Sequence, residues 1–332
     1  MPLLLTRRDV ERVLTMKEAI AAVEEGFRQL ALGRVNMPQR SAIRIPEHGG
    51  VHLSMPAYVG AGDAAASSGA LAVKVVTVYP ENPGRYGLPT TIGTLLLHDP
   101  RSGALLAIMD AGYLTAVRTG AASGVATRYL AREDARSVGL FGAGVQARTQ
   151  LAAVCEVRRI ERAVVCDPVR EARERYAREA GASLSIPIEA TDDPRACLRC
   201  DIVVTASSSK NPVFEGSLLS PGTHINCVGS HSPDARELDS ETVRRCRVIC
   251  DHIPARLAED GDFMVPIREG AVTESHFQAS LGEVVTGAIP GRRSREDITL
   301  FKSGGLAVQD AATGVRVYEL ARAAGVGTEV EI

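Results

Sequence analysis

The amino-acid sequence predicts an α/β protein with a doubly wound parallel sheet and a second domain of the α+β type. Three observations support this prediction. Apolar strands alternate with amphipathic helices through the middle of the chain, and an earlier part has one helix followed by several short β-rich segments. A length of 332 residues also suits two domains better than one.

The alternating part follows a helix rich in small residues, which we expect from residue 115 to 131. Glycine and apolar residues then predict a strand at 137–141 and a helix behind it. A second helix is expected at 168–181, with Pro168 in its first turn and Gly181 as its cap. Further apolar strands are expected at 162–167, 201–208, 223–230 and 247–251. Strands that are apolar throughout are typical of a parallel sheet covered on both faces.

The earlier part opens with a predicted helix. Thr15 and Glu18 have the spacing of a capping box, and apolar residues follow at helical intervals. Short strands are expected at 41–45, 51–59, 69–80, 91–99 and 104–110, and the small polar segment 61–69 is expected to be a loop.

Composition excludes several classes of function. A formal net charge of −2 gives no basic face for nucleic acid. Among seven cysteines, Cys197 and Cys200 form a C-x-x-C without a second pair, so we predict reduced thiols and no metal site. The chain has neither an 18-residue apolar stretch nor a signal-peptide pattern at its start, and the expected location is the cytoplasm.

A glycine-rich turn is the strongest local motif. Gly142, Gly144 and Ala147 form G-x-G-x-x-A between a predicted strand and a predicted helix, which is the context of a dinucleotide-binding Rossmann domain. The first glycine allows a tight turn, the second allows a pyrophosphate to approach the backbone, and the alanine allows close packing of helix on strand.

Asp167 ends the second strand of this unit, 25 positions after Gly142. A carboxylate there accepts hydrogen bonds from the ribose hydroxyls of NAD and repels the extra phosphate of NADP, although Arg170 is near. The sequence therefore predicts NAD as the cofactor. A Rossmann domain that binds another nucleotide, or none, is the alternative.

Three cations occupy unusual places. Lys74 interrupts an apolar strand, Arg118 lies in a small apolar segment, and Arg40 precedes a strand. Such cations can clamp a substrate carboxylate. The alternatives are an edge-strand lysine facing water, a solvated helix arginine and an ordinary loop arginine.

His231 and Asp234 follow the predicted strand at 223–228. Ligands of parallel sheets bind at the carboxyl ends of the strands, and a histidine there can act as acid or base. A loop histidine without a chemical role is the alternative reading.

Five segments together resemble the ornithine cyclodeaminase/μ-crystallin family: 87–127, 139–147, 222–239, 281–287 and 300–310. The resemblance implies a discontinuous substrate-binding and dimerisation domain formed by residues 1–117 and 305–332. It also implies a Rossmann NAD-binding domain at 118–304. Members of the family include ornithine cyclodeaminase, archaeal-type alanine dehydrogenase, ketimine reductases and μ-crystallin.

The resemblance also implies roles for single residues. Arg40, Lys74 and Arg118 match positions that hold the substrate carboxylate, and Lys74 is also a candidate to exchange a proton with the reacting nitrogen. His231 stands where cyclodeaminases have a catalytic aspartate, which speaks against that reaction. The implied cofactor-binding positions are Gly142, Ala143, Gly144, Val145, Gln146 and Asp167, with weaker matches at Thr91, Arg118, Ala206, Val228 and Ser303.

These observations predict an NAD(H)-dependent oxidoreductase acting on the CH–NH or C=N group of a small amino acid or cyclic imino acid. Reduction of pyrroline-2-carboxylate and oxidation of alanine are the expected activities, with Lys74 or a water near His231 moving the proton. The alternatives are ornithine cyclodeamination with internal recycling of NAD, and a non-catalytic protein that binds a dinucleotide and a ligand. The expected partner is a second copy of the chain.

Overall fold

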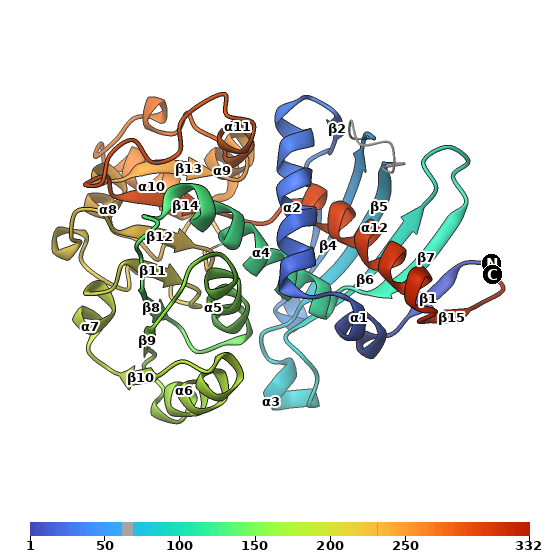
Figure 1. Cartoon of the computed structure of the whole chain (residues 1–332), viewed down its shortest axis with the longest axis horizontal. Coiled ribbons are helices and arrows are strands. Elements are labelled where there is room, and N and C mark those ends of the chain that lie inside the picture. Colours follow the sequence, from blue (N-terminus) through green and yellow to red (C-terminus); the bar gives the residue numbers. More distant parts are fainter. Residues whose placement is uncertain (62–68, 231) are drawn as a thin grey trace. The chain divides into compact units, whose positions relative to one another are not determined.

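The computed structural model describes residues 1–61, 69–230 and 232–332. These residues form two compact units, one from Met1–Arg118 with Leu306–Ile332 and the other from Thr119–Gly305 (Figure 1). Most of the loop expected at 61–69 lies outside the described residues, and so does His231.

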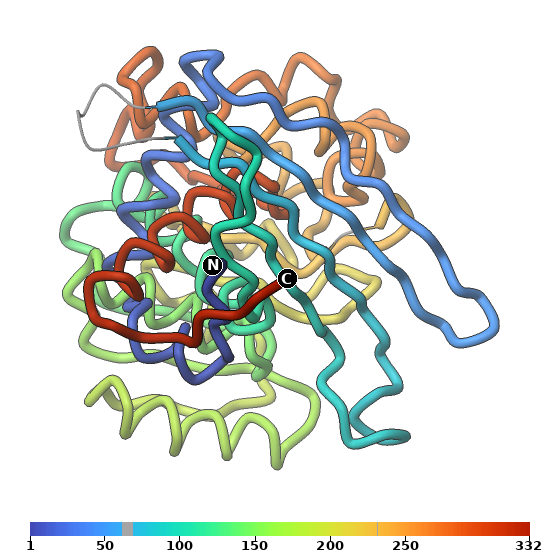
Figure 2. The backbone as a smooth tube through the Cα atoms, turned by 90° about the vertical axis from the view of Figure 1, so that its right-hand side faces the viewer, coloured from blue at the N-terminus to red at the C-terminus, as the bar shows by residue number. Residues whose placement is uncertain are grey.

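The first unit contains a mixed sheet of eight strands in its described part, in the order β15-β1-β7-β6-β5-β4-β2, with β3 paired to β4. β1 runs parallel to β7, and the other neighbours are antiparallel. β1 pairs with β15, which brings both chain ends together (Figure 2). The strands are β1 Leu3–Leu5, β2 Val35–Asn36, β3 Ser41–Ile45, β4 Gly50–Val59, β5 Ala70–Val78, β6 Thr91–His98, β7 Leu105–Asp110 and β15 Thr328–Glu329.

Two helices cover one face of this sheet. α2 (Met16–Ala31) packs against α12 (Ala307–Ala324), and α12 contacts β4, β5 and β6 (Figure 1). A Cβ on Gly26 would lie 3.2 Å from the Cβ of Ala312, so the small residue lets the two helices approach closely. The remaining helices are α1 Arg7–Val13, η1 Pro46–His48, α3 Asn82–Tyr86 and the first part of α4 Gly112–Leu130. As a result, the side chains of α12 lie over β5.

The start of α2 differs in one respect from the sequence prediction. The Thr15 side chain accepts a hydrogen bond from the Glu18 amide, as expected of an N-cap. Among the described residues, the Glu18 carboxylate does not accept the hydrogen bond from the Thr15 amide that would complete a capping box. It pairs instead with Arg316 of α12 at 2.8 Å. A contact between helices has replaced a local one.

The described part of the second unit contains seven parallel strands in the order β10-β9-β8-β11-β12-β14-β13. Alternate residues of β8, β9 and β11 enter two separate apolar clusters, one on each face; Val203 belongs to one and Val204 to the other. The predicted parallel sheet with two covered faces is therefore confirmed. The strands are β8 Ser137–Phe141, β9 Arg162–Cys166, β10 Ile188–Thr191, β11 Ile202–Thr205, β12 His224–Cys227, β13 Arg247–Cys250 and β14 Thr299–Lys302.

The helices of this unit follow their strands closely. They are the remainder of α4, then α5 Val145–Val157, α6 Arg170–Leu184, α7 Pro194–Leu198, η2 Gly216–Leu218, α8 Ser240–Arg245, α9 Ile253–Glu259, α10 Gly261–Arg268, η3 Glu274–His276 and α11 Leu281–Val285. The predicted end of α6 at Gly181 is wrong. The helix continues to Leu184 and is capped by Ser185 in the left-handed conformation, with φ of 56°.

The strand order of the second sheet reverses direction between β8 and β11, at the carboxyl edge of the sheet. From β8 the chain proceeds to β9 and β10 on one side, and then returns to β11 on the other side. The ends of β8 and β11 are therefore neighbours whose following segments diverge. In open parallel sheets this topological switch point is where ligands bind.

Candidate functional site

The G-x-G turn lies at this switch point. Gly142 has φ of 105°, which favours glycine, and its Cβ would lie 2.6 Å from the carbonyl oxygen of Ala206, just after β11. Its amide donates to the carbonyl oxygen of Cys166 at 2.9 Å, and the Ala206 amide donates to Phe141 at the same distance. Conformation and close packing both demand glycine at position 142.

Gly144 has a different role from Gly142. It is the N-cap of α5, with φ of −86°, a value open to any residue. A Cβ built there meets no heavy atom of the described chain within 4 Å. By contrast, Ala147 one turn later is fully buried against the sheet. The space over Gly144 and the N–H groups that a helix presents at its start fit a pyrophosphate.

Asp167 ties the turn to the end of β9. Its Oδ2 accepts a hydrogen bond from the Ala143 amide at 3.0 Å, and its Oδ1 accepts one from Val169 at 2.9 Å. Each carboxylate oxygen has a second lone pair for a ribose hydroxyl. Arg170, the cation noted near it in the sequence, pairs with Glu174 at 2.7 Å.

In the first unit, two of the three singled-out cations meet a buried carboxylate. The Lys74 Nζ lies 2.9 Å from Oδ1 and 2.8 Å from Oδ2 of Asp310, and the Arg118 Nε lies 2.9 Å from Oδ1. The Arg118 Nη1 also donates to Gln309 at 2.8 Å. Lys74 and Asp310 are each 1% exposed. Lys74 is therefore a buried residue of a central strand, and the edge-strand alternative is wrong.

The electrostatics of this cluster favour an anion. Burial, and next the positive charge of Arg118, lower the pKa of Lys74 to about 8, while Asp310 acts in the opposite direction. Arg40 lies near enough to lower the same pKa. With Lys74 protonated, Lys74 and Arg118 carry two positive charges against the one negative charge of Asp310, so these three side chains have a net charge of +1. Such an excess attracts a carboxylate ligand, and a lysine that titrates near neutral pH can move a proton.

The chain was compared with known proteins. The family model described as "Ornithine cyclodeaminase/mu-crystallin family" matches residues 1–325. The chain belongs to this family. An alanine dehydrogenase of Archaeoglobus fulgidus is 36% identical, with 99% of this chain and 98% of that protein covered.

Two solved family structures are also similar. A Thermococcus litoralis Δ1-pyrroline-2-carboxylate reductase in complex with NADH and L-proline has a TM-score of 0.94 and 47% identity, covering 99% of this chain and all of that one. An archaeal alanine dehydrogenase dimer with bound NAD has a TM-score of 0.92 and 34% identity, covering all of this chain and 99% of that one. Membership and fold class agree with the sequence predictions.

The weaker sequence matches fall at strand ends. In the second unit, Ala206, Val228 and Ser303 directly follow the neighbouring strands β11, β12 and β14, and the Ser303 amide donates to Cys227 at 3.1 Å. Val145 is 67% exposed at the start of α5. Thr91 begins β6 in the first unit.

Asp234, which the sequence paired with His231, is exposed and lies 4.0 Å from Arg268.

Sequence reasoning missed Asp310 and Gln309. Both are at most 1% exposed in the small apolar first turns of α12, and the Gln309 Nε2 has no hydrogen-bond partner among the described residues. A signal was available: a carboxylate between Gln309 and Ala311 is as unusual as a lysine in an apolar strand.

Sequence reasoning also missed a buried polar network behind the β12 and β14 loops. The Lys302 Nζ lies 2.7 Å from Asp262 and 3.3 Å from the Ser230 carbonyl oxygen. Glu237 accepts hydrogen bonds from the amides of Ser207 at 2.7 Å and Gly229 at 2.8 Å. These buried charges fix the backbone next to Val228 and Ser303.

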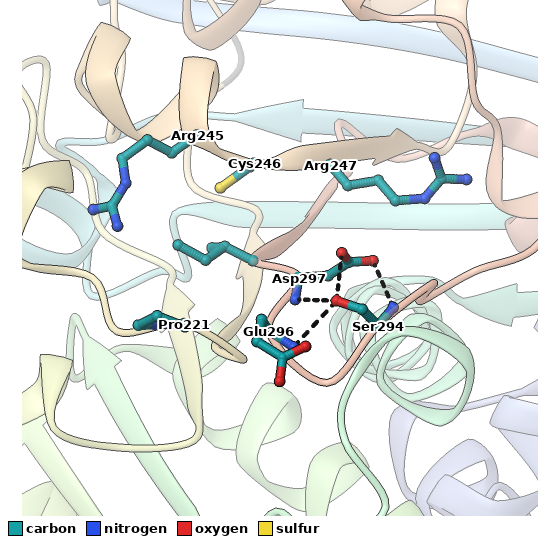
Figure 3. A pocket seen from close by; sticks show the side chains of 8 residues that line it. Pro221, Arg245, Cys246, Arg247, Ser294, Glu296 and Asp297 are labelled. Carbon is teal, nitrogen blue, oxygen red and sulfur yellow. Dashed lines mark hydrogen bonds between the residues drawn. The ribbon is translucent and has the colours of Figure 1, made fainter.

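A separate pocket of the second unit lies at the opposite edge of the sheet. Its lining includes Arg247 at the start of β13 and Ile298 just before β14 (Figure 3). Asp297 and Ser294 bond to each other there, and Arg247 donates to the Gly291 carbonyl oxygen at 2.7 Å. The polar groups of this pocket hydrogen bond to atoms of the loop that carries them, so this pocket is not our candidate site.

Within residues 1–61, 69–230 and 232–332, no group of three or more His, Cys, Asp or Glu side chains is placed to hold a metal ion. No helix in this part of the chain combines the length and apolar character needed to cross a membrane.

Proposed function

We propose that this chain is an NAD(H)-dependent oxidoreductase that reduces a cyclic imino acid, with pyrroline-2-carboxylate as the leading substrate. The observation that carries the proposal is the buried Lys74–Asp310–Arg118 cluster, which offers cations for a carboxylate and a lysine with a pKa of about 8. The likeness to a reductase of this substrate, at 47% identity, supports the choice. Alanine oxidation is the second candidate, supported by the similar alanine dehydrogenases.

In this proposal the substrate carboxylate binds Arg118 and Arg40. Arginine holds a carboxylate through two parallel hydrogen bonds and thereby fixes the orientation of the α-carbon. Asp310 holds the Arg118 guanidinium and Lys74 ammonium at 2.9 Å each, so both are oriented before substrate arrives. The bound dinucleotide supplies a hydride for the α-carbon, or accepts one in the reverse direction.

Lys74 then serves the reacting nitrogen. In the reductive direction its ammonium donates a proton to the imine nitrogen, and in the oxidative direction its neutral amine accepts one. A pKa of about 8 lets both forms exist near neutral pH. Burial keeps bulk water from exchanging that proton freely, because the Lys74 side chain is 1% exposed.

NAD is the proposed cofactor in preference to NADP. The G-x-G turn and the open space over Gly144 fit a dinucleotide. Asp167 places a carboxylate beside the turn through its bond to Ala143, and the engagement of Arg170 with Glu174 leaves that carboxylate to repel a 2′-phosphate. Both similar structures named above hold NADH or NAD.

We also propose a homodimer formed through the open face of the first sheet. Residues of β5 alternate between the face under α12 and this open face, which presents Val73 and Val75. Ile92 and Tyr58, each 42% exposed, add apolar surface on β6 and β4. An apolar sheet face of this kind requires a cover, and an alanine dehydrogenase of the family is a dimer. The cytoplasmic location remains a prediction from the sequence.

One assay separates the candidate functions. NADH and NADPH oxidation are followed by absorbance with pyrroline-2-carboxylate, piperideine-2-carboxylate, and pyruvate plus ammonia as separate substrates. Turnover of the cyclic imines with NADH supports the proposal, and turnover with pyruvate and ammonia alone assigns alanine dehydrogenation. If none of the three substrates is turned over, the proposed imine reduction is overturned. Formation of proline and ammonia from ornithine then identifies a cyclodeaminase, and binding without any turnover identifies a ligand-binding protein.

A further inference from the structure

Two thiols meet behind the dinucleotide turn of the second unit. Cys166 is the last residue of β9, and Cys197 lies in α7. Both side chains are on the same face of the sheet, where Cys166 packs against the apolar cluster that contains Cys197 and Val164. The Cys197 Sγ lies 3.5 Å from the Leu140 carbonyl oxygen and 3.7 Å from that of Val164, which is two residues before Cys166 on the same strand. The two thiols are close enough for each to shift the pKa of the other.

The two thiols differ in character. Cys166 is partly exposed, whereas Cys197 is fully buried. Interaction with Cys197 and the charge of Arg173 lower the pKa of Cys166; interaction with Cys166 and burial raise the pKa of Cys197. An accessible thiol with a lowered pKa next to a second thiol is the usual arrangement of a redox-sensitive pair. Cys155 offers a contrast, because burial alone raises its pKa to about 11.

The Cys166 backbone holds the glycine turn directly. Its carbonyl oxygen accepts the hydrogen bond from the Gly142 amide at 2.9 Å. The next residue, Asp167, accepts the hydrogen bond from Ala143 at 3.0 Å. A displacement of Cys166 therefore moves the groups that shape the turn and present the ribose-binding carboxylate.

The helix side of the pair has little room to move. A Cβ on Gly139 of β8 would lie 2.3 Å from the Cys197 carbonyl oxygen, so the backbone of α7 already touches the strand. A disulfide requires its sulfur atoms at about 2.05 Å, much closer than two thiols that are not bonded to each other. The closing movement accordingly falls on Cys166 and the end of β9.

We propose that Cys166 and Cys197 form a peroxide-sensitive thiol pair whose disulfide weakens dinucleotide binding. The Cys166 thiolate attacks one oxygen of hydrogen peroxide; an S–O bond forms, the O–O bond breaks, and hydroxide leaves and takes up a proton as water. Cys197 then loses its proton and attacks the Cys166 sulfur; the S–S bond forms, the S–O bond breaks, and a second water leaves. Two thiols are oxidised and one peroxide is reduced to two waters. The effect on binding rests on the proposed dinucleotide site.

The test uses the full-length protein before and after treatment with hydrogen peroxide. Peptide mass spectrometry identifies the crosslink, and fluorescence titration measures the Kd for NADH. We expect a Cys166–Cys197 crosslink and a Kd raised about tenfold or more, with recovery on dithiothreitol treatment. Cys197→Ser should abolish both effects, and Cys200→Ser, in the same C-x-x-C, should retain both.

Each other outcome is decisive. A Cys197–Cys200 crosslink, or no crosslink at all, overturns the proposed pair. A Cys166–Cys197 crosslink with an unchanged Kd overturns its effect on the turn. Failure of the reduced protein to bind NADH refutes the dinucleotide site itself and the proposed effect with it, while the crosslink analysis still decides the pairing.

Discussion

The Nζ of Lys74 lies 2.9 Å from Oδ1 of Asp310, a residue 236 positions later in the chain. Arg118 reaches the same oxygen at 2.9 Å from a third element. One carboxylate on α12 therefore holds two cations from β5 and α4 in a buried cluster. Three separate segments must fold together before this cluster exists, and its chemistry belongs to none of them alone.

Replacing Lys74 by methionine should lower kcat for imine reduction by about a hundredfold to ten-thousandfold, the usual contribution of a positioned proton donor. Asp310 keeps Arg118 as its partner, so the variant retains a compensated carboxylate and should fold. Steady-state kinetics and circular dichroism measure the two effects. Lys17→Met on the exposed side of α2 serves as control. A folded Lys74→Met enzyme with full kcat contradicts the proposed role.

The pH dependence follows from the lowered pKa of Lys74, about 8, in a site faced by Arg118, Asp310 and Arg40. Reduction requires the ammonium form, so kcat/KM for the imine should be level below this pH and fall about tenfold per unit above it. Oxidation requires the neutral amine, so kcat/KM for the amino acid should rise with pH and level off above about 8. Profiles in both directions check the opposite signs. Two profiles of the same sign rule out Lys74 as the titrating group.

Asp310→Asn should lower the pH above which kcat/KM for imine reduction falls. The carboxylate raises the pKa of Lys74, and its loss leaves burial and Arg118 unopposed. A nearby opposite charge contributes about one unit or more, so the fall in reductive kcat/KM should begin near or below pH 7. The exposed Asp192→Asn is a matched control that should keep the original profile. If a folded Asp310→Asn enzyme loses reductive kcat/KM at the same pH as the wild type, Asp310 has no influence on the proton-transfer step.

The Rossmann unit was predictable because local and tertiary preferences agree. Apolar residues such as Val203 and Val204 alternate between two clusters, so a strand covered on both faces has the continuous apolar pattern expected at that position. The sequence prediction and the structure disagree at the ends of helices and strands, where local sequence signals are weak. α6, expected to end at Gly181, continues to Leu184.

The candidate substrate site was only partly predictable. An apolar strand with one lysine has the same sequence pattern whether that lysine faces water or a buried partner. The choice depended on Asp310, which no local pattern connects to Lys74. The turn at Gly142 could be predicted because its requirements are local: a left-handed backbone and close approach to one strand.

Cofactor choice should respond to the charge of Asp167. Asp167→Asn keeps one acceptor for the Ala143 or Val169 amide but removes the charge that repels a 2′-phosphate. We expect the ratio of kcat/KM for NADPH to that for NADH to rise about tenfold or more, equal to about 1.4 kcal/mol. Kinetics with both cofactors measure this ratio, and the exposed Glu189→Gln is the control. An unchanged ratio assigns Asp167 only to holding the turn.

The two glycines of the turn should fail in different ways when changed to alanine. Gly142→Ala places a Cβ 2.6 Å from the Ala206 carbonyl oxygen at a φ of 105°, so unfolding free energy should fall by about 1–3 kcal/mol. Gly144→Ala meets no described atom within 4 Å at a φ of −86°, so its stability should stay within about 0.5 kcal/mol. Its methyl group instead occupies the space proposed for the pyrophosphate, and the Kd for NADH should rise about tenfold or more. Denaturant unfolding and NADH titration on both variants separate the effects. A stable Gly144→Ala protein that binds NADH like the wild type places the pyrophosphate elsewhere, because a Cβ and a phosphate cannot share that volume.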